Sequence, residues 1–182
     1  MNDGKISVRY ARALYEAARE QHCEKEVYEA LRNLSDNVAD NLSQFDAVLK
    51  NPIIGNDDKI ALLRTAVGTQ VPQCLDNFIN LVVGQGRESK MYLIALKYQE
   101  QYRTEKNILL THVTTASELS EDALQRIKDY VARTFHAEVE AKVTINPALV
   151  GGYTLDIENK RLDASIAGRL NKLKEELKSN CK

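Results

Sequence analysis

Apolar residues recur at three- and four-residue steps through roughly the first hundred positions, which predicts a succession of amphipathic helices. In the segment that begins near residue 24, for example, Val27, Leu31, Leu34 and Val38 fall on one face. Proline, glycine and capping residues divide this part of the chain into six such segments. The expected helices cover about residues 6–21, 24–42, 43–50, 56–68, 72–84 and 89–102. Short connections between six amphipathic helices predict a compact bundle.

After residue 107 the period of the pattern changes. Residues 108–114 are rich in branched side chains and favour a strand. Ser120 is suited to cap a helix with acidic residues in its first turn and with Leu124, Ile127 and Val131 on its apolar face. Strict alternation then predicts two half-buried strands and, after the turn at 159–160, a short third one. In the first of these strands the residues expected to point inward are Val139, Ala141, Val143 and Ile145.

A last helix is expected from Asp163 to the end of the chain, with Ile166, Leu170, Leu173 and Leu177 on one face. The sequence therefore predicts two domains. Residues 1–106 are expected to form a six-helix domain. Residues 107–182 are expected to form a small α+β domain, with a mostly antiparallel sheet and a charged C-terminal helix.

Charge and composition narrow the function classes. The 25 basic and 26 acidic residues nearly balance, which argues against a chain that coats nucleic acid. No apolar run approaches the roughly 20 residues that span a bilayer, and no secretory signal is visible, so direct membrane insertion is not expected. The three cysteines are odd in number and widely spaced. This favours free thiols in a reducing compartment over a disulfide framework.

Motifs for catalysis or cofactor binding are missing from the sequence. The three histidines lie far apart and none has a partner at metal-ligand spacing. The chain contains no phosphate-binding, dinucleotide-binding or hydrolase motif. The glycines at 84 and 86 follow a helix, so a helix C-cap explains them better than a phosphate loop. We therefore expect no cofactor, no metal and no catalytic residue.

Two helices carry more apolar surface than one core requires. On a helical wheel the apolar arc of the first helix spans about 220°, and that of the fifth about 200°, against the roughly 100° that packing on one core needs. Two interpretations remain open from periodicity alone. The two helices could form the walls of a groove for an amphipathic helix of a partner, or they could be central helices buried on all sides.

Several segments resemble one known family. The family is that of the delta subunits of bacterial ATP synthases, relatives of the mitochondrial oligomycin sensitivity-conferring protein. Its successive sequence segments are similar to residues 9–14 (Arg-Tyr-Ala-Arg-Ala-Leu), 51–53 (Asn-Pro-Ile) and 78–87 of this chain. The segment 145–157, Ile-Asn-Pro-Ala-Leu-Val-Gly-Gly-Tyr-Thr-Leu-Asp-Ile, is similar to the signature of that family. The resemblance covers nearly the whole chain in order.

The resemblance implies a non-catalytic stator subunit. In that family the N-terminal domain grips the N-terminal helices of the alpha subunits, with helices one and five as the main groove, and the C-terminal domain engages the b subunits of the peripheral stalk. The catalytic head then resists the rotor, so that torque drives ATP synthesis. A single copy in the complex, on the cytoplasmic side of the bacterial inner membrane, is implied. The family and the wheel together suggest seven groove residues: Tyr10, Ala13, Leu14, Ala17, Phe78, Ile79 and Val82.

Two rival functions follow from other features. A nucleic-acid-binding adaptor would use the basic C-terminal helix, with Lys172, Lys174 and Lys178 as phosphate contacts and salt-sensitive affinity. A small enzyme would need a site that forms only in three dimensions. The balanced charge counts against the first rival, and the scattered histidines against the second.

Overall fold

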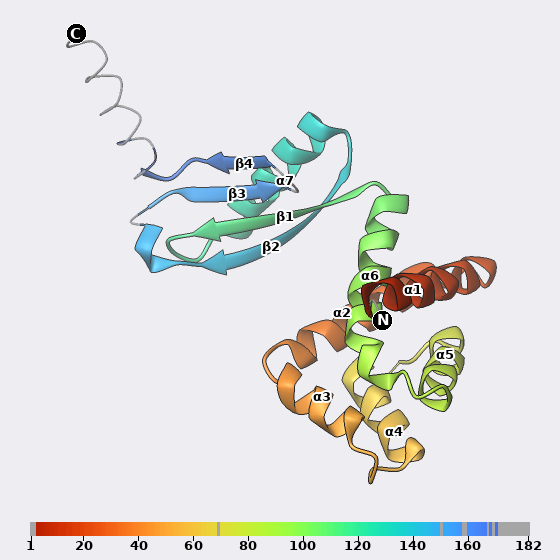
Figure 1. Cartoon of the computed structure of the whole chain (residues 1–182). Helices are drawn as coiled ribbons and strands as arrows, with labels where there is room; N and C mark the ends of the chain where they lie inside the picture. Colours follow the sequence, from red (N-terminus) through yellow and green to blue (C-terminus); the bar gives the residue numbers. More distant parts are fainter. Residues whose placement is uncertain are drawn as a thin grey trace. The chain divides into compact units, whose positions relative to one another are not determined.

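The computed structural model describes residues 3–68, 70–149, 151–157, 160–166, 168 and 170 (Figure 1). The chain divides into two compact units, Met1–Tyr102 and Arg103–Lys182, which we call the helical unit and the sheet unit. The basic residues of the expected C-terminal helix beyond residue 170 lie outside the described residues, as does the turn at 158–159.

The helical unit contains the expected helices, all close to their predicted bounds. Between α5 and α6 the chain forms one turn of 3₁₀ helix, η1 (Glu88–Lys90). The second helix ends at Ala39 rather than at residue 42, because the chain turns at residues 40–41. The third helix begins directly after this turn. The helices are α1 (Asp3–Glu20), α2 (Glu24–Ala39), α3 (Leu42–Lys50), α4 (Asn56–Val67), α5 (Gln73–Gly84) and α6 (Met91–Glu105), the last of which crosses the unit boundary.

The glycine-containing turn after α5 is a helix cap, as the sequence indicates. Gly86 has a φ of 64°. Its N–H donates to the carbonyl of Val83, and the N–H of Arg87 donates to that of Val82, at 3.0 and 2.9 Å. This hydrogen-bond pattern is a Schellman motif, in which a left-handed residue satisfies the last carbonyls of the helix.

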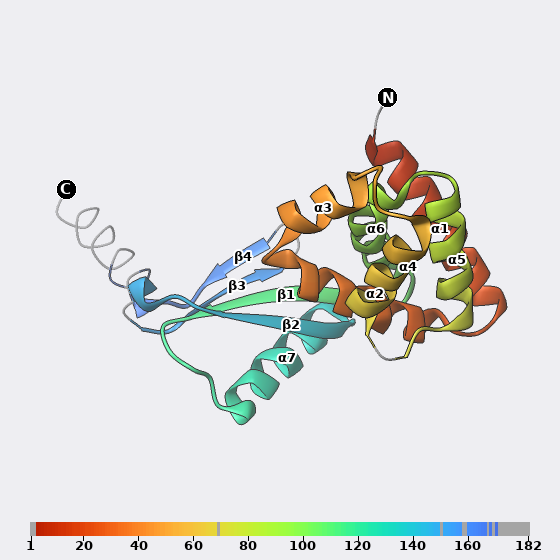
Figure 2. The ribbon, with the colours of Figure 1, turned by 90° about the horizontal axis from the view of Figure 1, so that it is seen from below.

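The core of the helical unit fixes the position of α1 and α5. Figures 1 and 2 both show these helices side by side, and they are in direct contact. From α1, Ala11, Tyr15 and Ala18 are buried, and Tyr15 lies against Tyr98 of α6 with ring centroids 5.8 Å apart. Tyr98 also donates a hydrogen bond to the carbonyl of Glu24, at 3.1 Å. One face of α1 is therefore fixed to the core through α2 and α6.

The sheet unit begins as a β–α–β element. β1 (Ile108–Thr115) pairs in parallel with β2 (Glu138–Ile145), and α7 (Glu121–Phe135) connects the two strands. The 3₁₀ turn η2 (Pro147–Leu149) then leads to β3 (Tyr153–Ile157), which pairs antiparallel with β1 and with β4 (Lys160–Asp163). The strand order is β2-β1-β3-β4. Two of the three described pairings are antiparallel, as expected.

Helix α7 starts at the predicted cap and forms the core of this unit with the sheet. The hydroxyl of Ser120 accepts a hydrogen bond from the N–H of Ala123, at 3.3 Å. Ile127 and Val131 of α7 pack on Val113 and Leu155 of the sheet. At Gly152, with a φ of 82°, a Cβ would lie 2.5 Å from the carbonyl oxygen of Ala164, so the backbone of residue 164 approaches too closely for any side chain at this position.

The prediction that all of β2 points its apolar side chains into the core is wrong at its far end. Val143 is 39% exposed and Ile145 49%. Val143 lies in a cross-strand row with Val113, Leu155 and Leu162, and only the two central members are buried. A helix about 10 Å wide covers roughly two strands spaced 4.8 Å apart. One helix therefore leaves the ends of the row open.

Candidate functional site: an apolar groove between α1 and α5

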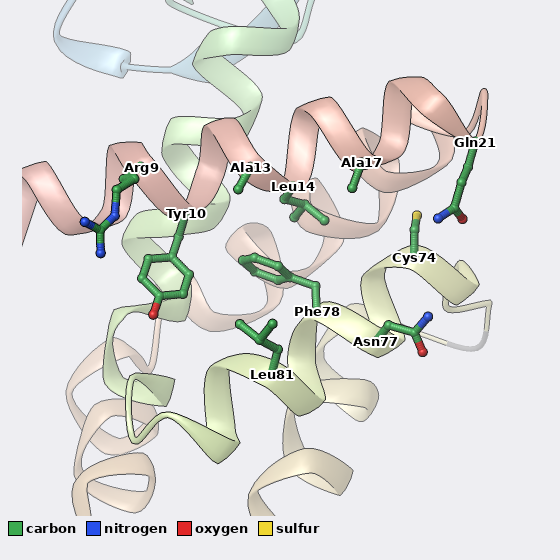
Figure 3. A pocket seen from close by; sticks show the side chains of 10 residues that line it. All are labelled: Arg9, Tyr10, Ala13, Leu14, Ala17, Gln21, Cys74, Asn77, Phe78 and Leu81. Atoms are coloured by element: carbon green, nitrogen blue, oxygen red, sulfur yellow. The ribbon is translucent and has the colours of Figure 1, made fainter.

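The groove between α1 and α5 has a volume of about 400 Å³. Its lining residues come from two helices in steps of three and four, so each helix presents one continuous stripe. Figure 3 shows the apolar side chains of both stripes pointing into the space between the two helices. The lining consists of Arg9, Tyr10, Ala13, Leu14, Ala17 and Gln21 from α1 and the turn after it, and Cys74, Asn77, Phe78 and Leu81 from α5.

Two aromatic rings face one another across the groove. Tyr10 and Phe78 meet edge to face, with centroids 6.2 Å apart and an interplanar angle of 70°, which is a favourable geometry for aromatic pairs. Both rings remain half-buried. Between the larger side chains, Ala13 and Ala17 are too small to fill the space. The combination of rigid rings and small residues produces an apolar hollow on the surface.

Five of the seven residues predicted for the groove line it: Tyr10, Ala13, Leu14, Ala17 and Phe78. Ile79 and Val82 are not among the lining residues, and both are buried in the core of the helical unit. Each follows a groove-lining residue by one position, which is a rotation of 100° about the helix. On α5 the face toward the groove is therefore the one that carries Phe78 and Leu81.

Sequence reasoning missed the remaining lining residues. Leu81 belongs to the apolar arc of α5, but its 53% exposure is not readable from the periodicity. Three further lining residues are polar, so an apolar arc does not identify them although they follow the same helical spacing: Arg9, Gln21 and Asn77. The second interpretation of the wide arcs, that both helices are buried on all sides, is wrong because Leu81 and the aromatic pair reach solvent.

Polar groups lie at the two ends of the groove (Figure 3). The guanidinium of Arg9 lies at the end near Tyr10. Gln21 and Asn77 lie at the opposite end, where Asn77 also accepts a hydrogen bond from Gln73, at 3.2 Å. No carboxylate is among the lining residues. The groove thus offers an apolar centre with one positive charge at its margin.

The thiol of Cys74 lies at the Gln21 end. Cys74 is 5% exposed, and this burial is the main reason that the pKa of its thiol is raised to about 12. The side-chain hydrogen bond to Cys23, with the two sulfurs 2.8 Å apart, acts in the same direction. Cys74 is therefore a protonated thiol at neutral pH.

A second hollow, of about 480 Å³, lies between α2 and the segment that joins α4 to α5. The lining of this hollow has no continuous apolar stripe, because it is interrupted by four polar residues: Glu26, Glu29, Asn33 and Gln70. Across the described part of the chain, no three His, Cys, Asp or Glu side chains lie close enough to hold a metal ion. None of the described helices is both long and apolar enough to cross a bilayer.

Comparison with known proteins agrees with the resemblance noted above. Residues 6–177 match the family described as ATP synthase delta (OSCP) subunit. The ATP synthase subunit delta of Phocaeicola vulgatus is 34% identical over 174 residues, covering 95% of this chain and 94% of that one. The subunit delta of Bacteroides fragilis is 35% identical over 178 residues, covering 97% and 95%.

A solved structure shares the fold. A chain in the cryo-EM structure of the Toxoplasma gondii mitochondrial ATP synthase hexamer aligns with a TM-score of 0.68 at 20% identity, covering 97% of both chains. Fold and relatives together define a non-catalytic subunit of a larger assembly. The chain belongs to the ATP synthase delta (OSCP) subunit family, and its function is that of a stator component of the peripheral stalk. None of the comparisons supports the nucleic-acid-binding alternative.

Proposed function

We propose that the groove between α1 and α5 binds the amphipathic N-terminal helix of an alpha subunit in the catalytic head of an ATP synthase. The observation that carries this proposal is the pair of continuous apolar stripes that enclose about 400 Å³. An amphipathic helix is recognised by such a groove through apolar side chains at positions i, i+3, i+4 and i+7. Family membership supplies the identity of the partner.

The shape and charge of the groove restrict what can bind. Ala13 and Ala17 leave room for branched or aromatic side chains of the partner, and the rings of Tyr10 and Phe78 provide rigid walls. Arg9 at the margin favours an acidic side chain or a helix C-terminus at that end. A partner helix with one apolar stripe and a carboxylate near the Arg9 end fits best.

The sheet unit binds the b subunits of the peripheral stalk in this proposal. It carries exposed apolar side chains that its own core does not use. A chain that contacts the head through one unit and the stalk through the other transmits the counter-torque without chemistry. It acts as a single copy at the cytoplasmic face of a bacterial inner membrane. The exposed residues are Val143, Ile145, Leu162, Ile166 and Leu170.

Calorimetric titration of the full chain with a peptide that copies the N-terminal helix of the alpha subunit tests the groove. Leu81→Asp places a charge on the exposed lining of α5, and we expect affinity to fall by about 30-fold or more, as for the loss of a dominant interface residue. Val8→Asp is the matched control, since Val8 is also a half-exposed apolar residue but lies outside the groove.

Loss of binding in Leu81→Asp with normal binding in Val8→Asp supports the proposal. Equal affinities for the wild-type chain and Leu81→Asp would place the alpha subunit elsewhere. Circular dichroism of each variant confirms that the helices are intact. The rival nucleic-acid function predicts salt-dependent binding of duplex DNA or RNA by the same wild-type sample, and the stator proposal predicts none.

A further inference from the structure

Cys23 and Cys74 are 51 positions apart in the sequence, yet their sulfur atoms lie 2.8 Å apart in the helical unit. This separation is shorter than van der Waals contact and is less than 1 Å longer than the roughly 2.05 Å of a disulfide bond. The odd number and wide spacing of the cysteines had argued against a disulfide. The fold brings these two together at the Gln21 end of the groove.

The backbone holds Cys23 in place from both sides. After α1, His22 adopts a left-handed conformation with a φ of 55°. The N–H of Cys23 then donates to the carbonyl of Ala18, at 3.0 Å, and its own carbonyl accepts from Val27, also at 3.0 Å. The first hydrogen bond belongs to a Schellman turn and the second to the start of α2. Cys23 is thus a fixed residue at a helix junction.

The two thiols differ in access. Cys23 is partly exposed in the turn between α1 and α2, whereas Cys74 is buried in the first turn of α5. A disulfide-bearing reagent can therefore reach Cys23 first. Burial keeps Cys74 protonated and shielded, but its sulfur already lies within reach of any adduct formed at Cys23.

We propose that Cys23 and Cys74 form a reversible disulfide, a modification site that joins the α1–α2 turn to α5 at the end of the groove. The oxidant is a low-molecular-weight disulfide such as oxidised glutathione. The inference does not depend on which partner occupies the groove.

The reaction consists of two thiol–disulfide exchanges. In the first, the thiolate of Cys23 attacks one sulfur of oxidised glutathione. The glutathione S–S bond breaks, and one glutathione thiolate leaves and takes up the proton that Cys23 lost. In the second, Cys74 loses its proton, and its sulfur attacks the Sγ of Cys23 and releases the other glutathione thiolate, which is protonated. Two protein thiols are oxidised and one glutathione disulfide is reduced to two thiols.

The test uses the purified full chain in buffers of increasing oxidised-to-reduced glutathione ratio. Remaining thiols are alkylated after acid quenching, and peptides are mapped by mass spectrometry without reduction. We expect a peptide pair joined through Cys23 and Cys74 that disappears on return to reduced glutathione. Cys181→Ser is the control variant and should form the same bridge.

Three results would overturn the proposal. One is a stable glutathione adduct on Cys23 with Cys74 still a free thiol. Another is a bridge from either cysteine to Cys181. The third is full alkylation of Cys23 and Cys74 in oxidised glutathione alone. Cys23→Ala adds a further requirement: Cys74, which is only 5% exposed, should then form a glutathione adduct more slowly than Cys23 does in the wild-type chain.

Discussion

The two units present apolar surface in different ways. In the helical unit, two helices lie side by side and their spare apolar stripes face the same space, so the surface is concave. In the sheet unit, the spare apolar residues lie where the sheet extends past α7, with Val143 at one edge and Leu162 at the other. A groove between helices can enclose a side chain of a partner on several sides. A sheet edge is an open surface, so a partner side chain can only lie across it.

This difference predicts different consequences for substitutions. On α5, neighbouring residues divide between groove and core: Leu81 lines the groove and is 53% exposed, whereas Val82 is buried. At the sheet edge, an exposed residue such as Val143 lies in the same cross-strand row as buried residues. A substitution there can therefore change both the contact with a partner and the stability of the sheet unit. Substitutions in both units and oxidation of the thiol pair test this contrast, in decreasing order of expected effect.

The largest effect is expected from α5, where the groove face and the core face are one residue apart. Ile79→Ala should lower the free energy of unfolding of the helical unit by about 2–5 kcal/mol, because it creates a cavity at a fully buried site. Leu81→Ala, on the same helix but 53% exposed, should change it by less than about 0.5 kcal/mol. Urea titration followed by circular dichroism measures both. Similar values for the two variants would mean that the groove face is assigned wrongly.

Oxidation of the thiol pair should stabilise one unit and not the other. A bridge between residues 51 apart in the sequence restricts the unfolded helical unit and should add about 2–4 kcal/mol to its stability. The sheet unit lies outside the closed loop and should keep its stability. Native-state hydrogen exchange on the oxidised and reduced chain separates the two. Equal protection gains in both units would contradict the assignment of the bridge to Cys23 and Cys74.

Truncation of a groove wall should affect binding more than folding. Tyr10→Ala removes one ring of the edge-to-face pair with Phe78 and should weaken peptide binding by about 2 kcal/mol, or roughly 30-fold. Tyr15→Ala is the comparison on the same helix. Tyr15 is buried against Tyr98, so its loss should lower the melting temperature. Calorimetry and thermal unfolding of both variants distinguish the roles, and a Tyr10 variant with normal affinity would exclude that residue from the interface.

The sequence predicted the features that depend on local pattern. The six helices of the helical unit follow from apolar spacing, and Ser120 and Gly86 act as caps at the predicted positions. What it missed depends on neighbours. An apolar arc of about 200° on α5 cannot reveal which of its edges faces solvent, so Ile79 and Val82 were assigned to the groove.

Two further points required the three-dimensional arrangement. The alternation in β2 predicts one inward face correctly, but whether Val143 is covered depends on the width of α7 relative to the sheet. Likewise, the distance between Cys23 and Cys74 is set by the packing of α5 against the end of α1, which no spacing in the sequence encodes. Local order was therefore predictable, and the positions of edges and junctions were not.

The smallest effect is expected at the edge of the sheet. Ile145 lies at the end of β2, 49% exposed, and the proposed stalk contact would cover it. Ile145→Asp should weaken binding of a soluble b-subunit fragment by about 1 kcal/mol, less than a groove substitution, because an edge residue is only partly desolvated in a complex. Thr144→Asp, on the same strand but pointing to the opposite face, is the matched control. If both substitutions reduce affinity equally in a sedimentation or fluorescence titration, added negative charge is the cause and not a lost apolar contact. If Ile145→Asp alone weakens binding, the uncovered end of the sheet is part of the stalk interface, and the contrast between groove and edge extends to how each unit holds its partner.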